Sequence, residues 1–146
     1  MKKKSFTLLE LIFVIVVIGI LAGIALPKLF SGISDARLSK AKTQIATIRA
    51  GISSAYSKNI MSGDSDKCPE LEGSDSTKLF ENILVTPIIP NQSDINWTLE
   101  SNNTTETKYK LTINNEQTTF TYEKNASKNC PFTCNSSDDL CKKFSR

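Results

Sequence analysis

One carboxylate, Glu10, lies inside the apolar N-terminal part of this chain of 146 residues. From Phe6 to Leu26 the sequence contains 21 residues, and only Thr7 and Glu10 among them are polar. A carboxylate in such a run costs up to about 3 kcal/mol at the centre of a bilayer, and residues of this kind are usually functional. The chemistry open to Glu10 is neutralisation of a cation, so we expect it to need a cationic partner within the membrane.

The rest of the chain offers little for catalysis. It contains no histidine, which removes the side chain that titrates nearest neutral pH and the commonest imidazole ligand for metals. The sequence shows no Gly-rich phosphate loop, no nucleophile elbow and no cysteine paired with a base. Four carboxylates lie in a polar segment that we expect to form a solvated face: Asp64, Asp66, Glu70 and Glu72. We therefore predict no enzymatic activity, no metal and no other cofactor.

The apolar run is long enough to cross a membrane. As a helix it measures roughly 31 Å, about the thickness of one bilayer core. Three lysines, at positions 2–4, precede the run and only Lys28 lies at its far end, so the positive-inside rule places the N-terminus in the cytoplasm. We predict a single pass through the bacterial inner membrane, with everything after Pro27 in the periplasm.

The order of residues around Glu10 resembles the N-terminal signal of type IV pilins and type II secretion pseudopilins. The resemblance rests on Ser5–Glu10, on the apolar helix with Gly19, and on Pro27. The family pattern is a short basic leader, a cleavage point before Phe, Thr next, Glu four residues on, and Pro at the end of the buried stretch. Ser5 is the one departure, because the family nearly always has Gly there.

The resemblance implies processing and assembly. A prepilin peptidase would cleave between Ser5 and Phe6, the new Phe6 amine would be N-methylated, and Glu10 would neutralise it in its own or a neighbouring helix of a filament. The implied segments are a leader (1–5), a transmembrane and polymerisation helix (6–27) and an exported pilin-like globular head (28–146). The implied partners are other pilin-like subunits, the peptidase, an inner-membrane assembly platform and an assembly ATPase, within an envelope-spanning filament.

Two other interpretations of the N-terminus are open. A cleaved secretory signal shares the lysines and the apolar core, and Gly23-Ile24-Ala25 supplies small residues for a signal peptidase, but the run exceeds the usual length of about 7–15 residues. A plain membrane anchor explains the span but not Glu10. Gly19 and Gly23 also have the four-residue spacing that allows helices to approach closely in a bundle.

Charge and cysteine content describe the exported part. Loss of the three leader lysines reduces the 18 basic residues to 15, equal to the 15 acidic ones, so the formal charge of +3 does not indicate nucleic-acid binding.

Four cysteines follow the apolar run: Cys68, Cys130, Cys134 and Cys141. An even number in an oxidising compartment favours two disulfides. We favour Cys68 paired with one of the C-terminal three and the other two paired together; a four-thiolate zinc site is the alternative.

Periodicity predicts the elements of the head. An apolar stripe of helical spacing predicts one helix from the membrane to about residue 58, bent or loosened at Pro27 rather than ended there: Leu38, Ala41, Ile45, Ile48, Ile52 and Ala55. Residues 78–85 have the pattern of a short helix. Alternation over 95–100, 109–113 and 119–122, with a turn at 114–116, predicts a three-stranded antiparallel meander packed on the helix. The predicted fold is α+β: a long N-terminal transmembrane helix, a small head with this sheet, and a disulfide-stapled C-terminal tail.

Asparagines in Asn-x-Ser/Thr sequons occur six times, at positions 91, 96, 102, 103, 125 and 135. Asn96, Asn102 and Asn125 also have an acidic residue two positions earlier, which looks like the acceptor site of bacterial oligosaccharyltransferases. The alternative is an Asn- and Thr-rich, solvated sheet edge.

Three functions are compatible with these features. The leading hypothesis is a structural subunit that polymerises into a pseudopilus or thin pilus serving type II secretion or DNA uptake. The second is a filament-tip minor pilin that binds DNA or a surface through the basic tail of Lys142, Lys143 and Arg146. The third is a freely secreted disulfide-bonded domain, which the position of the mature N-terminus would distinguish.

Overall fold

The computed structural model describes residues 6–64, 67–91, 94–125, 127 and 129–144, with the side chains of 29–31 left out. The elements follow in the order α1, β1, β2, β3, β4 and α2. Contacts divide the chain into two compact units, Met1–Ala36 and Arg37–Arg146. The second unit, called the head below, contains all four strands and the hydrophobic core.

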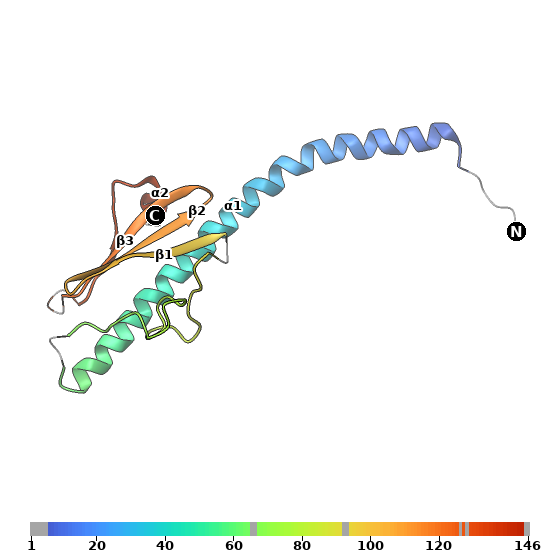
Figure 1. Cartoon of the computed structure of the whole chain (residues 1–146). Helices are drawn as coiled ribbons and strands as arrows, with labels where there is room; N and C mark the ends of the chain where they lie inside the picture. Colours follow the sequence, from blue (N-terminus) through green and yellow to red (C-terminus); the bar gives the residue numbers. More distant parts are fainter. Residues whose placement is uncertain (1–5, 65–66, 92–93, 126, 128, 145–146) are drawn as a thin grey trace, which may run out of the picture. The chain divides into compact units, whose positions relative to one another are not determined.

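Helix α1 runs from Leu8 to Met61 (Figure 1), and Pro27 does not end it. At its start the Glu10 N–H donates a 3.3 Å hydrogen bond to Thr7 Oγ1, so Thr7 is the N-cap residue. At its end Gly63 adopts a φ of 88°, and the Asp64 N–H donates to the Asn59 carbonyl at 2.9 Å. A glycine in the left-handed region just beyond the last turn is a common way for a helix to stop.

The sheet is antiparallel, in the order β1-β2-β3-β4. Its strands are β1 (Ile95–Asn102), β2 (Glu106–Ile113), β3 (Glu116–Glu123) and β4 (Phe132–Cys134). The predicted meander corresponds to β1–β3. Asn114 and Asn115, with φ of 50° and 68°, join β2 to β3 in a two-residue turn. Positive φ at both turn residues matches the twist of a hairpin, and asparagine tolerates it.

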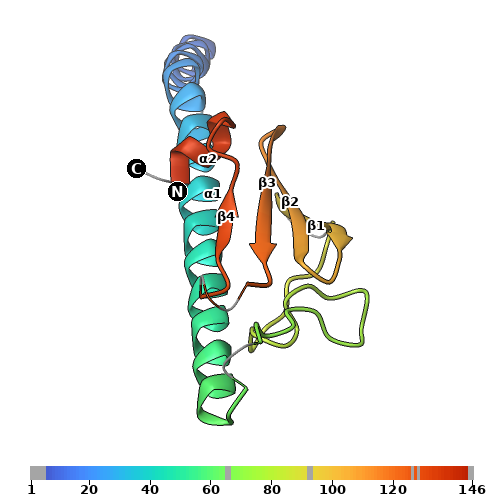
Figure 2. The same cartoon turned by 90° about the vertical axis from the view of Figure 1, so that its left-hand side faces the viewer.

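The prediction of three strands was wrong, because β4 adds a fourth beside β3. Only three residues form β4, too few for alternation to reveal a strand. The strand lies at the edge of the sheet beside α1 (Figure 2), and Arg49 Nε donates a 3.2 Å hydrogen bond to the Phe132 carbonyl. The helix therefore covers part of an edge that would otherwise present unpaired backbone groups.

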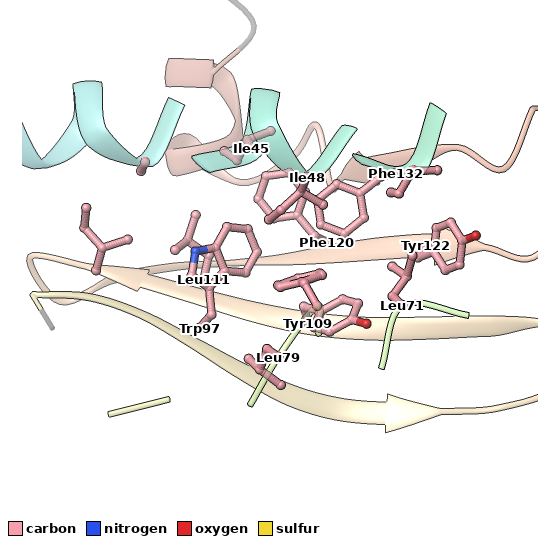
Figure 3. Close-up of a cluster of buried hydrophobic side chains, with 14 of the residues drawn as sticks. Ile45, Ile48, Leu71, Leu79, Trp97, Tyr109, Leu111, Phe120, Tyr122 and Phe132 are labelled. Carbon is pink, nitrogen blue, oxygen red and sulfur yellow. The ribbon is translucent and has the colours of Figure 1, made fainter. Parts of the chain in front are cut away.

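The core of the head lies between α1 and one face of the sheet. The middle of the predicted helical stripe is buried (Ala41, Ile45, Ile48 and Ile52), whereas Leu38 and Ala55 are half-buried. Figure 3 shows helix and strand side chains converging. The Trp97 ring is fully buried, and its Nε1–H donates a 3.1 Å hydrogen bond to Gln44 Oε1 on α1. Full burial of a large apolar side chain contributes about 1.5–3 kcal/mol, so this face holds the head together.

The predicted helix over 78–85 was also wrong. This segment forms turns, closed by a bridge in which Leu79 and Ile88 exchange two backbone hydrogen bonds of 2.8 and 3.0 Å. Phe80 has a φ of 60° and is fully buried, with its ring stacked on Tyr109 at a centroid distance of 4.4 Å. A phenylalanine at positive φ is uncommon. Burial of the ring in the core has overridden the local helical pattern.

Candidate functional site

The assembly segment, defined here as residues 6–27, begins with two residues before the helix. Phe6 is 75% exposed, Thr7 caps α1, and Glu10 lies in the first turn. Among the residues that the structure describes, none forms an ion pair with the Glu10 carboxylate. The expected cleavage residue Ser5 lies outside the described residues. A carboxylate in the first turn lies at the positive end of the helix dipole, but this partial charge does not replace a cationic partner in lipid.

The remainder of the assembly segment is apolar and exposed. By length and composition α1 contains one stretch able to cross a membrane, and none of that stretch is buried within the chain. A Cβ atom added at Gly19 or Gly23 would meet nothing within 4 Å. An apolar surface of this length requires either lipid or other apolar helices to cover it.

Two disulfides hold the head. Cys68 pairs with Cys130 at a Cα–Cα distance of 5.6 Å, and Cys134 pairs with Cys141 at 5.8 Å. The first joins the loop after α1 to the segment before β4, and the second joins β4 to α2 (Asp139–Phe144). Because every cysteine is consumed in a disulfide, no thiolate remains for the zinc alternative.

The loop between α1 and β1 contains a carboxylate that the sequence pattern placed in solvent. Glu72 is half-buried, and its Oε1 accepts hydrogen bonds from the Tyr109 hydroxyl at 2.6 Å and from the Phe80 N–H at 3.3 Å. Burial raises the pKa of Glu72, although both hydrogen bonds act against the rise. Glu70 is solvated as expected, in an ion pair of 2.9 Å with Lys124. The sequence signal that could have indicated a buried acceptor such as Glu72 was Tyr109, an inward-facing tyrosine whose hydroxyl needs a hydrogen-bond partner.

The basic tail is engaged within the head. Lys142 Nζ lies 2.8 Å from Asp139 Oδ1, and Lys143 Nζ lies 2.6 Å from Glu116 Oε2. Arg146 lies outside the described residues. Phe144 packs on Phe120 with a centroid distance of 6.0 Å. Ion pairing of both lysines reduces the positive charge they offer to a nucleic acid, so no observation here favours the DNA-binding hypothesis.

The described chain thus combines an exposed apolar helix that has a carboxylate in its first turn with a helix-packed antiparallel head. Residues 1–26 match the family model described as the prokaryotic N-terminal methylation motif. The chain therefore carries the N-terminal signal of the type IV pilin and pseudopilin family. No curated protein and no solved structure matches the chain. The match ends at residue 26, so the fold of the head comes from the structure alone.

Proposed function

We propose that this chain is a structural pilin-like subunit that polymerises into a pseudopilus or thin pilus serving type II protein secretion or DNA uptake. The observation that carries the proposal is the methylation motif over residues 1–26, together with the exposure of every apolar side chain from Leu8 to Leu26 in helix α1. Such a surface is covered by lipid before assembly and by the helices of other subunits after it.

Processing supplies the cationic partner that Glu10 lacks. Cleavage between Ser5 and Phe6 frees an ammonium group two residues before the first residue of α1. A carboxylate and an ammonium that meet in an apolar environment offset each other's burial, so contact between subunits is favoured where the two groups approach. The Phe6 amine of the same or a neighbouring subunit is the partner we assign to Glu10.

The proposal places the protein in the bacterial inner membrane, with residues 1–5 as a leader, 6–27 as the transmembrane helix and 28–146 as the periplasmic part, which contains the head. It requires a prepilin peptidase, an inner-membrane assembly platform and an assembly ATPase as partners, together with further pilin-like subunits. The role is structural rather than enzymatic.

The mature N-terminus tests this function. The full-length protein is isolated from membranes of cells that express the assembly machinery, and its N-terminal peptide is identified by mass spectrometry. We expect N-methyl-Phe6 as the first residue. A mature chain that begins near Leu26 contradicts the proposal and indicates ordinary secretion, and an intact leader on all copies indicates a simple anchor.

A further inference from the structure

The six sequons differ in how the head presents them. Asn96, the second residue of β1, is half-buried, and its side-chain amide is paired with Asn91 through both its oxygen and its nitrogen. Asn96 Nδ2 donates to Asn91 Oδ1 and Asn96 Oδ1 accepts from the Asn91 N–H, each at 2.8 Å. An amide nitrogen held in a strand by such a pair is poorly placed to react.

Asn102 has the opposite surroundings. It is the last residue of β1, and Asn102, Asn103 and Thr104 are all exposed. Its Oδ1 accepts hydrogen bonds from Thr107 Oγ1 at 2.9 Å and from Lys124 Nζ at 3.1 Å. No described residue accepts a hydrogen bond from its Nδ2. The side-chain oxygen is therefore held by two hydrogen bonds, whereas the nitrogen of this exposed residue has no described acceptor.

A second sequon with a preceding acid lies at the same end of the sheet. Asn125 follows β3 and is exposed, and its Oδ1 accepts a 2.6 Å hydrogen bond from Ser127 Oγ, the hydroxyl of its own sequon. Lys124 joins the two sequons, because its N–H donates to the Thr105 carbonyl at 2.9 Å while its Nζ reaches Asn102. The turn between β1 and β2 and the loop after β3 thus lie together.

We propose that this end of the head is an N-glycosylation surface, with Asn102 and Asn125 as acceptors and Asn96 unmodified. In the transfer, Asn Nδ2 attacks the anomeric carbon of an oligosaccharide linked to a polyprenyl diphosphate. The nitrogen–carbon bond forms, the carbon–oxygen bond to phosphate breaks, Nδ2 releases one proton, and the polyprenyl diphosphate leaves. An oligosaccharyltransferase catalyses this step on the exported side of the membrane, so modification in the cell rests on the proposed function.

Two adjacent threonines allow matched variants. Thr104→Ala removes the Asn102 sequon without changing the asparagine, whereas Thr105→Ala removes only the Asn103 sequon, which has no acid two residues before it. Full-length protein purified in detergent, with disulfides intact, is incubated with a bacterial oligosaccharyltransferase and a polyprenyl-diphosphate oligosaccharide. Intact mass and peptide mapping then locate the glycans. This reaction requires no export, so its failure is separate from failure of the filament function.

We expect two added glycans on the unaltered protein, on Asn96→Gln and on Thr105→Ala. We expect one on Thr104→Ala, on Asn102→Gln and on Asn125→Gln. The proposal is overturned if glycans are transferred to the protein only after it has been reduced and unfolded. It is also overturned if Asn96→Gln or Thr105→Ala loses a glycan, or if the protein isolated from its own host has an unmodified mass. A glycosylated native mass with the mapped positions supports it.

Discussion

The Tyr109 hydroxyl donates a 2.6 Å hydrogen bond to Glu72 Oε1, joining the inner face of β2 to the loop between α1 and β1. Burial raises the pKa of Tyr109, so the hydroxyl keeps the proton that it donates. Tyr122 makes an equivalent contact to the same loop through a 2.8 Å hydrogen bond to the Pro69 carbonyl. The loop is therefore held to the sheet by polar anchors as well as by the Phe80 ring.

Tyr109→Phe should lower the free energy of unfolding of the head by about 1–2 kcal/mol, because it removes a donor from a half-buried carboxylate. Tyr122→Phe removes a donor from a neutral carbonyl and should cost only about 1 kcal/mol or less. Denaturant unfolding of the full-length protein in detergent measures both, followed by the fluorescence of Trp97, the only tryptophan in the chain. A larger loss in Tyr122→Phe than in Tyr109→Phe contradicts the role given to Glu72.

The raised pKa of Glu72 predicts a pH dependence of stability. Because the folded-state pKa lies above the ordinary value of 4.5, the folded head binds more protons than the unfolded chain in this window. The stabilising contribution of Glu72 is thus fully present below 4.5 and is lost as pH rises through the raised value. Glu72→Gln should flatten this part of the profile of unfolding free energy against pH.

Glu100 serves as the control of opposite sign. Its hydrogen bond with Lys110 lowers the pKa of Glu100, so its contribution is present above 4.5 and is lost as pH falls through the lowered value. Glu100→Gln should reduce the loss of stability on the acid side. Identical pH profiles for the two variants and the unaltered protein would show that neither shift affects folding.

The two disulfides should differ in their effect on stability. Cys68 and Cys130 are 62 residues apart, whereas Cys134 and Cys141 are 7 apart. Loop-closure entropy predicts a loss of about 4 kcal/mol for the double serine variant of the first pair and about 2 kcal/mol for that of the second. Thermal unfolding of both variants beside the unaltered protein tests the order; the reverse order refutes the entropic explanation.

Gly51 allows α1 to approach the loop. A Cβ atom at this position would lie 2.7 Å from the Ile83 carbonyl oxygen, a backbone atom that cannot move without its peptide plane. Gly51→Ala should lower stability despite the gain of about 1 kcal/mol that alanine brings to a helix interior. Ser53→Ala, at an exposed position of the same helix, is the control and should change stability by less than about 0.5 kcal/mol. Stabilisation by Gly51→Ala would contradict the packing described here.

Glu10→Leu should abolish incorporation of the subunit into filaments while leaving it in the membrane, because an unneutralised ammonium then opposes helix packing. Glu10→Gln should behave in the same way, since it keeps the shape but loses the charge. Sheared filaments are compared with membranes by quantitative immunoblotting, after the mature N-terminus of each variant has been shown to be correct. Unchanged filament yield in both variants would falsify the electrostatic account of assembly.

The sequence predicted those parts of the fold in which one periodicity extends over several turns or strands. The apolar stripe from Ala41 to Ile52 and the alternation around Tyr109 are of this kind. Glu10 could be singled out from the sequence because it is a charged residue within an apolar run. The segment around Phe80 was mispredicted because its conformation is set by distant core contacts, not by its neighbours in sequence. Strand β4 was not predicted because three residues are too few to show an alternating pattern. The burial of Glu72 was not predicted because its hydrogen-bond partner Tyr109 lies 37 residues away in the sequence.

The position of the helix start has a consequence for maturation. The first helical hydrogen bonds run from the Leu11 N–H to the Thr7 carbonyl and from the Glu10 N–H to the Thr7 hydroxyl. They involve no atom upstream of Thr7, so a cut between Ser5 and Phe6 breaks none of them. Under the proposed function, proteolysis there would leave the described helix unchanged and alter only the charge at its N-terminus, so the subunit would become competent for assembly without refolding.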